Sequence, residues 1–305
     1  MIQSDYPLSG TLTVPNEQNE IFPAVLIISG SGKADRDGNM RKMKMNMYKE
    51  LAEFLTKNGF ITLRYDKRGT HQSGGDFHKV GVSDLIEDAI QCVKFLQNQA
   101  IVDKEKIFIL GHSEGALIAP AVNHRISVSG LILLAGAAGP TKELSNFQTE
   151  KLFKEMNEAN GFKGWIFRTF KIVNKTKKQN DKIFKKVLHS DKDVIRVKGV
   201  KLNAKWFRET LSYNVRDYLQ EVSCPVLAIT GEKDVQVPPE HAQLIAETVK
   251  GEAEWHIISN MNHVLRDYEG EHTLLGLIKE YKAVVDDPLN RELLDKISRW
   301  LHARL

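Results

Sequence analysis

The sequence is short of the features that mark disulfide-rich, metal-binding and membrane-spanning proteins. Among its 305 residues there are two cysteines, Cys92 and Cys224, and their number and spacing suit neither a disulfide framework nor a thiolate metal site. No apolar run approaches the roughly 18 residues that a membrane-spanning helix needs. Residues 1–10 lack a basic patch followed by an apolar stretch, so we expect no secretory signal. These absences predict reduced thiols and a cytoplasmic location.

The composition is that of a globular protein with a large core. Apolar residues make up 42% of the chain and charged residues 27%, and the length suits one large α/β domain with an insertion. The charge is unevenly spread, because residues 141–215 hold 18 Lys and Arg against 8 Asp and Glu while the whole chain carries only +4. A basic segment therefore lies within an otherwise acidic chain.

Short β-type runs alternate with helical patterns, and this alternation is typical of a parallel sheet with crossover helices. We predict strands at residues 8–14, 24–28, 60–65, 106–110, 131–134, 225–230 and 255–258. Residues 138–218 break the alternation, because they hold helical patterns but no clear buried strand. The prediction is an α/β fold with a doubly wound, mostly parallel sheet formed by residues 1–137 and 219–305. A helical cap, residues 138–218, is inserted between two of its strands.

The motif with the most chemical content is Gly-His-Ser-Glu-Gly at residues 111–115, which matches G-x-S-x-G. An apolar strand precedes it and a helix rich in small residues follows, as this turn requires. The turn holds its serine above the sheet, and the helix N-terminus behind it favours negative charge. Ser113 is therefore the predicted nucleophile. An ordinary glycine turn is the plainer alternative.

A serine hydroxyl needs a base that removes its proton, and the base needs an acid that orients it. His263 follows the last predicted strand by a few residues, whereas the other nine histidines lie in less suitable places. Asp234 follows the strand at 225–230, which gives the chain order serine, aspartate, histidine. The loop after residues 131–134 offers no carboxylate. We therefore predict Ser113, Asp234 and His263 as a catalytic triad. For Asp234 the plainer alternative is a loop-capping role.

An oxyanion hole needs two backbone N–H groups. The sequence predicts that Glu114, directly after the nucleophile, and Ser31, on the loop after residues 24–28, supply them. Gly30, Gly32 and His112 are the expected substrate-binding residues, with the imidazole of His112 turned away from the nucleophile. A phosphate-binding loop at 30–32 is a weak alternative, because the Walker lysine spacing and a full G-x-G-x-x-G are both missing.

Two polar turns, at residues 35–38 and 66–69, read Asp-Arg-Asp-Gly and Asp-Lys-Arg-Gly. We interpret both as charged braces for loops near the mouth of the pocket. Their aspartates have no further ligand cluster beside them, so we predict no metal site and no cofactor.

With these motifs the chain resembles the α/β-hydrolase superfamily, in particular bacterial carboxylesterases and serine-aminopeptidase-like hydrolases of the S33 type. The resemblance is carried by residues 28–38, 63–69, 111–115, 230–234 and 261–263. It implies hydrolysis of carboxylic esters of small or medium acyl groups through an acyl-enzyme at Ser113. The chain departs from related esterases at Lys33, where they often have proline, and at Ser29, where many relatives have histidine.

Several alternatives remain open at this stage. The same triad suits an acyl-CoA thioesterase, or an aminopeptidase in which Glu114 or a cap carboxylate holds the substrate's ammonium group. The expected partner is a small-molecule ester, either neutral or anionic, and we expect no nucleic-acid or membrane partner. A non-enzymatic protein whose basic cap binds nucleic acid is the rival from another class. The sequence does not define the oligomeric state.

The basic charge of the cap is interpreted as a solvated surface, or alternatively as an attraction for an anionic substrate. The aromatic residues of the cap are expected to pack over the sheet and to line an apolar acyl pocket. They are Phe162, Trp165, Phe167, Phe170, Trp206 and Phe207.

Overall fold

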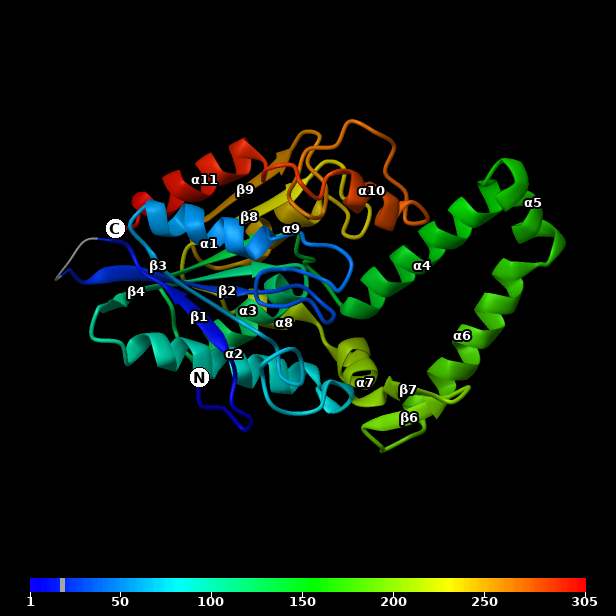
Figure 1. Cartoon of the computed structure of the whole chain (residues 1–305), viewed down its shortest axis with the longest axis horizontal. Helices are drawn as coiled ribbons and strands as arrows, with labels where there is room; N and C mark the ends of the chain where they lie inside the picture. The colour runs from blue at the N-terminus through cyan, green and yellow to red at the C-terminus, as the bar shows by residue number, and fades with distance from the viewer. Residues whose placement is uncertain (17–19) are drawn as a thin grey trace.

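A computed structural model describes residues 1–16 and 20–305, and its central element is a seven-stranded sheet (Figure 1). The strand order is β1-β3-β2-β4-β5-β8-β9, with β1 antiparallel to β3 and the remaining pairs parallel. The predicted, mostly parallel sheet is confirmed. The strands are β1 Gly10–Thr13, β2 Phe22–Ile28, β3 Ile61–Tyr65, β4 Val102–His112, β5 Gly130–Leu134, β8 Val226–Gly231 and β9 Ala253–Ile258.

Helices cover both faces of this sheet, so its central strands are buried on both sides. Alternate side chains of β2 show the arrangement, because Leu26 packs into one apolar layer and Ile27 into the other. Burial on both faces explains the unbroken apolar runs in the sequence. One layer contains α2 Val82–Gln97, α3 Glu114–Arg125, α8 Val215–Leu219 and α9 His241–Thr248. The other contains α1 Met47–Lys57, α10 Leu277–Ala283 and α11 Arg291–His302.

The segment between β5 and β8 forms a projecting arm followed by elements that pack against α2 and the short helix η1 Phe77–Lys79. The long helices α4 and α6 run outward and back, and α5 joins them at the far end (Figure 1). The elements of the arm are α4 Thr141–Glu158, α5 Gly161–Thr169 and α6 Ile172–Leu188. They are followed by β6 Val194–Val197, β7 Val200–Asn203 and α7 Ala204–Ser212.

The segment between β5 and β8, which we call the insert, contains a β-hairpin that was not predicted from the sequence. Strands β6 and β7 pair with each other and with no strand of the main sheet, and they turn at Lys198 and Gly199. Both turn residues have positive φ, 50° and 83°, as two-residue hairpin turns require. The strands are only four residues long, and each is too short to show a clear alternation of apolar and polar residues in the sequence.

Two further features bear on the predictions made above. Among the helices of the described residues, none has both the length and the apolar character needed to cross a bilayer. The two cysteines are free thiols, with Cys92 buried and Cys224 half-buried.

Candidate active site

The three predicted catalytic residues lie beyond the carboxyl ends of three parallel strands. Ser113 directly follows β4, Asp234 lies on the loop after β8, and His263 lies on the loop after β9. Parallel strands have their carboxyl ends at the same edge of a sheet, where the sites of open α/β proteins are found. The topology thus brings together residues that are 150 positions apart in the chain.

Ser113 sits in a strained turn that only its neighbouring glycines allow. Its φ is 54° and its ψ is −115°, an unusual conformation for a residue with a side chain. A Cβ atom at Gly111 would lie 2.4 Å from the carbonyl oxygen of Gly115, and one at Gly115 would lie 2.1 Å from that of Ile28. The Ser113 N–H donates to the carbonyl of Leu134 on β5 at 2.9 Å. These contacts hold the serine at the N-terminus of α3.

A continuous hydrogen-bonded chain joins the three side chains. The Oγ of Ser113 lies 3.1 Å from Nε2 of His263, and Nδ1 of His263 lies 2.7 Å from Oδ2 of Asp234. The other carboxylate oxygen of Asp234 accepts the N–H groups of Gln236 at 2.8 Å and Val237 at 3.0 Å. These three hydrogen bonds keep the carboxylate oriented, so the imidazole presents Nε2 to the serine as an acceptor.

The structure places His112 in a supporting position rather than in contact with a substrate cavity. Its Nε2 lies 2.8 Å from the carbonyl oxygen of His263, and its Nδ1 lies 2.9 Å from the hydroxyl of Tyr48. Burial, followed by the charge of His263, lowers the pKa of His112 to about 3, so the ring is neutral at pH 7. Nε2–H therefore donates to His263, and Nδ1 accepts from Tyr48. This position differs from the substrate-binding one that the sequence suggested.

On the loop after β2, the backbone N–H of the predicted Ser31 is open, whereas that of its neighbour Gly30 is not. The N–H of Gly30 donates to the Tyr48 hydroxyl at 2.7 Å and is therefore occupied. Among the described residues, the N–H groups of Ser31 and Glu114 donate to no protein acceptor. Both residues line the cavity that contains Ser113, whereas Gly32 lines the neighbouring cavity.

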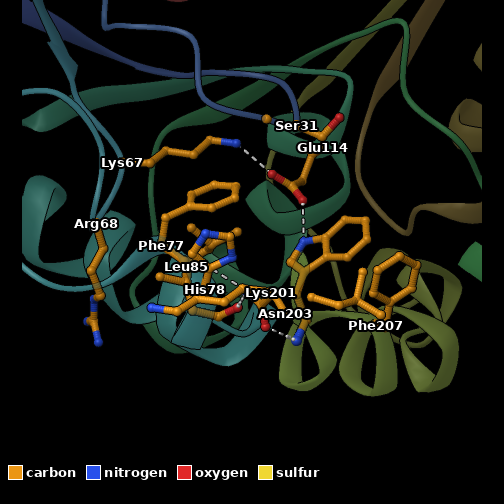
Figure 2. A pocket seen from close by; sticks show the side chains of 14 residues that line it. Ser31, Lys67, Arg68, Phe77, His78, Leu85, Glu114, Lys201, Asn203 and Phe207 are labelled. Carbon is orange, nitrogen blue, oxygen red and sulfur yellow. Dashed lines mark hydrogen bonds and ion pairs between the residues drawn. The ribbon is translucent and has the colours of Figure 1, made fainter. Parts of the chain in front are cut away.

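A buried ion pair beneath the cavity was not predicted. Nζ of Lys67 lies 2.5 Å from Oε2 of Glu114 and also donates to the carbonyl of Gly30. Oε1 of Glu114 accepts the indole N–H of Trp206, on α7, at 2.9 Å. Figure 2 shows the Glu114 carboxylate between these two donors. The chain Lys67–Glu114–Trp206 therefore joins the core to the insert at the edge of the active site.

The two polar turns brace the loops, as the sequence analysis expected. Arg36 of the first turn binds Asp66 of the second at 2.7 Å, and the Asp66 carboxylate is almost fully buried. Arg68 binds Asp88 on α2 at 2.6 Å. These pairs fix the backbone from which Lys67 extends toward the cavity (Figure 2).

Two adjoining cavities flank Glu114 and Trp206. The smaller, of about 160 Å³, contains Ser113, and the larger, of about 380 Å³, is mainly apolar. Both are lined by Ser31, Glu114 and Trp206. Residues that line the smaller one alone include Leu117, Ile118, Leu144, Gln148, Tyr213 and Val237. Residues that line the larger one alone include Phe77, His78, Leu85, Lys201, Leu202 and Phe207.

The expectation that all the aromatic residues of the insert line the pocket is wrong for four of the six. One of the four, Phe167, packs against the small core of the arm. Trp206 and Phe207 do line the cavities. Phe162, Trp165 and Phe170 lie on or beside α5, at the far end of the arm, and are exposed. Their sequence spacing resembles that of core residues, but the arm carries them away from the sheet.

The sheet topology and the serine turn place this chain among the α/β-hydrolases, as its resemblance implied, and solved structures support this assignment. Est1E from Butyrivibrio proteoclasticus is 18% identical with a TM-score of 0.62, and the match covers 99% of this chain and 97% of Est1E. An esterase from Thermogutta terrifontis is 20% identical with a TM-score of 0.58, covering 98% and 94%. The proline iminopeptidase of Mycobacterium smegmatis is 14% identical with a TM-score of 0.61, covering 99% and 97%. At these identities the likeness establishes the fold.

Within that fold, the chain belongs to the hydrolase family described as serine aminopeptidase, S33, whose profile matches residues 41–269. The matched range includes Ser113, Asp234 and His263 but not Ser31. Esterase EstD of Thermotoga maritima is 27% identical over 96% of this chain. The chain spans 65% of the length of EstD.

Proposed function

We propose that this protein is a serine hydrolase that cleaves carboxylic esters of small or medium acyl groups. The observation that carries the proposal is the hydrogen-bonded series Ser113–His263–Asp234 at 3.1 Å and 2.7 Å, built on a strained turn at a helix N-terminus. A serine in this geometry has a base for its proton and a site for developing charge beside it. The likeness to EstD of Thermotoga maritima adds support for ester substrates.

The proposed reaction has two steps. Ser113 Oγ attacks the acyl carbonyl while Nε2 of His263 takes the hydroxyl proton, and Asp234 stabilises the resulting imidazolium. The tetrahedral intermediate collapses, the alkoxide leaves with the proton from His263, and the acyl group remains on Ser113. Water then attacks this acyl-enzyme, giving its proton to His263, and the acid is released. Ser113 recovers its proton in that second collapse.

We assign the stabilisation of the oxyanion to two backbone N–H groups near Ser113. The N–H of Glu114 lies at the first turn of α3, where the helix dipole adds to its attraction for negative charge. The N–H of Ser31 comes from the opposite side, on the loop after β2. Gly30 supports this loop through its own bonds with Tyr48 and Lys67 but gives no amide to the intermediate.

The two cavities define the expected size of the substrate. The space of about 160 Å³ around Ser113 suits a short acyl group, and the larger apolar space of about 380 Å³ suits the other portion of the ester. Trp206 stands between them. Trp206→Ala should therefore shift the preference from p-nitrophenyl acetate and butyrate toward octanoate, as measured by the ratios of kcat/KM. An unchanged chain-length profile would contradict this division of the site.

The Glu114 contacts favour ester over aminopeptidase chemistry. An aminopeptidase needs a free carboxylate for the substrate's ammonium group, but both oxygens of Glu114 are engaged, one by Lys67 and one by Trp206. We therefore expect turnover of p-nitrophenyl butyrate and little turnover of alanine p-nitroanilide. A thioester remains compatible with the triad, and Lys201 at the larger cavity is a cation that an anionic substrate could meet.

A fluorophosphonate probe tests the central claim directly. The probe should label Ser113, as mapped by mass spectrometry, and the label should be lost in Ser113→Ala and in His263→Ala. Circular dichroism of both variants checks that they remain folded. Absence of labelling in the folded wild-type protein would refute an activated serine.

We also propose a cytoplasmic location, which the two free thiols support.

A further inference from the structure

Three exposed aromatic side chains form a cluster at the far end of the arm, which we call the aromatic tip. They are Phe162, Trp165 and Phe170, with exposed fractions of 74%, 53% and 53%. The rings of Phe162 and Trp165 stack with centroids 5.7 Å apart, and Phe170 meets Trp165 edge-on at 6.5 Å. A contiguous exposed apolar patch of this kind usually marks an interaction site, whereas single exposed apolar residues are ordinary.

The outward direction of the aromatic tip is fixed by the packing of α5. Phe167, on the same helix, packs with Phe153, Met156 and Val173 in a small core between α4, α5 and α6. The guanidinium of Arg168 donates to the carbonyl of Ala159 at 2.9 Å, at the C-terminus of α4. The arm thus has its own core, and the tip lies outside it.

The two helices that carry and follow the aromatic tip are rich in positive charge, whereas the last turn of α4 before it holds Glu155 and Glu158. Residues 161–188, which comprise α5 and α6, contain nine Lys and Arg and a single acidic residue, Asp181. All nine cations are exposed, and none pairs with a carboxylate of residues 1–16 or 20–305. Much of the arm therefore presents unneutralised charge beside bare aromatic rings.

We propose that the aromatic tip docks on an anionic lipid bilayer, with its rings at the boundary between headgroups and acyl chains and the cations nearest to it in sequence, Lys163, Arg168, Lys171 and Lys175, over the phosphates. Aromatic side chains favour this boundary, and each lysine near an anionic surface adds attraction. This proposal differs from the expectation of no membrane partner made from the sequence. A nucleic acid is less suited, because single strands are bound along a groove, whereas α5, which carries the tip, lies at the end of a projecting arm (Figure 1).

Docking at the tip leaves the active site free. The cavities are lined by the core, β7, α7 and the first two turns of α4, whereas α5 lies at the far end of the arm (Figure 1). The proposal is therefore independent of the chemistry at Ser113, and turnover of a water-soluble ester should be the same with and without the aromatic tip.

Vesicle flotation of the full chain tests the proposal. Vesicles of phosphatidylcholine with phosphatidylglycerol should carry the protein upward, and vesicles of phosphatidylcholine alone should not. Replacing Phe162, Trp165 and Phe170 together with Ser should reduce the bound fraction at least tenfold and leave hydrolysis of p-nitrophenyl acetate unchanged. Raising the salt concentration from about 0.05 to 0.5 M should also release the wild-type protein, because it shortens the screening length.

Two single variants serve as controls. Ile278→Ser removes an apolar side chain that is 67% exposed on α10, outside the aromatic tip, and should float like the wild type. Trp165→Phe keeps a ring at the tip, so it should still float, but the blue shift of tryptophan fluorescence on vesicle addition should disappear.

Several results would overturn the proposal. The wild-type protein could stay unbound at low salt, or the triple variant could float equally well. A dimer that the same substitutions dissociate, without any vesicle binding, would assign the aromatic tip to a second copy of the chain. A shift of DNA or RNA mobility that depends on the tip, again without vesicle binding, would assign it to nucleic acid.

Discussion

The buried pair of Lys67 and Glu114 offers a sharp test of how the site is held together. The Lys67 side chain is 6% exposed and that of Glu114 is 11% exposed, so little solvent screens the pair. Lys67→Met removes the charge and keeps most of the side-chain length. It leaves the Glu114 carboxylate with the indole N–H of Trp206 as its remaining side-chain partner.

The expected loss is large because an unpaired carboxylate remains buried. Breaking a buried ion pair by removing one partner costs about 3–5 kcal/mol. We expect Lys67→Met to lower the free energy of unfolding by about 3 kcal/mol. The carbonyl of Gly30 also loses its donor, which should loosen the loop that carries the Ser31 amide and reduce kcat by about tenfold.

Urea unfolding at pH 7 and kcat for p-nitrophenyl acetate are the two measurements. The double variant Lys67→Met with Glu114→Gln removes the stranded charge and should recover at least about 1 kcal/mol relative to the sum of the two single variants. The matched control is Lys250→Met, because the pair of Lys250 with Glu221 is 60% and 54% exposed and should contribute below about 1 kcal/mol. If Lys67→Met costs no more than Lys250→Met, the argument from burial fails.

Three other predictions concern the catalytic residues and their support. Asp234→Asn should reduce kcat about 10⁴-fold by presenting the wrong tautomer of His263, while the midpoint of urea unfolding changes little; a loss below tenfold would count against the assigned role. His112 cannot take up a proton in the folded state until the pH nears 3, whereas the unfolded chain protonates near pH 6.5. Stability should therefore fall as pH drops from 6.5 toward 3, by up to about 1.4 kcal/mol per pH unit from this residue. His112→Gln should show a shallower fall in urea titrations at several pH values, and equal slopes would be evidence against this account. Gly115→Ala should lower Tm by at least about 5 °C or prevent folding, since its Cβ would meet the Ile28 carbonyl at 2.1 Å, and a wild-type Tm would contradict the tight packing.

The sheet and the proximity of the three side chains of the proposed triad could be predicted because each leaves a local signal. Strands buried on both faces appear as unbroken apolar runs, such as residues 24–28 and 131–134. Parallel order then places the loops after β4, β8 and β9 at one edge, so Ser113, Asp234 and His263 follow from their positions after strands.

The supporting contacts could not be predicted because they join distant segments through single side chains. Lys67, Glu114 and Trp206 come from three parts of the chain, and no spacing rule links them. The bonds of Tyr48 with Gly30 and His112 are of the same kind. The path of the insert could not be predicted either, because the pattern of an amphipathic helix does not define which neighbouring element covers its apolar face.

The closed base of the insert also has a consequence for the order in which the chain assembles. Pro140 and Asn214 form a β-bridge, and the N–H of Thr141 donates to the carbonyl of Tyr213 at 3.1 Å, so the insert begins and ends at one point. Strands β5 and β8 must pair across this whole segment. If the insert folds first, the loop to be closed shrinks from about 90 residues to about 20, which lowers the entropic cost of pairing by about 1.3 kcal/mol. Substitutions that unfold the arm should therefore slow refolding of the sheet several-fold in stopped-flow experiments, although they touch none of its strands.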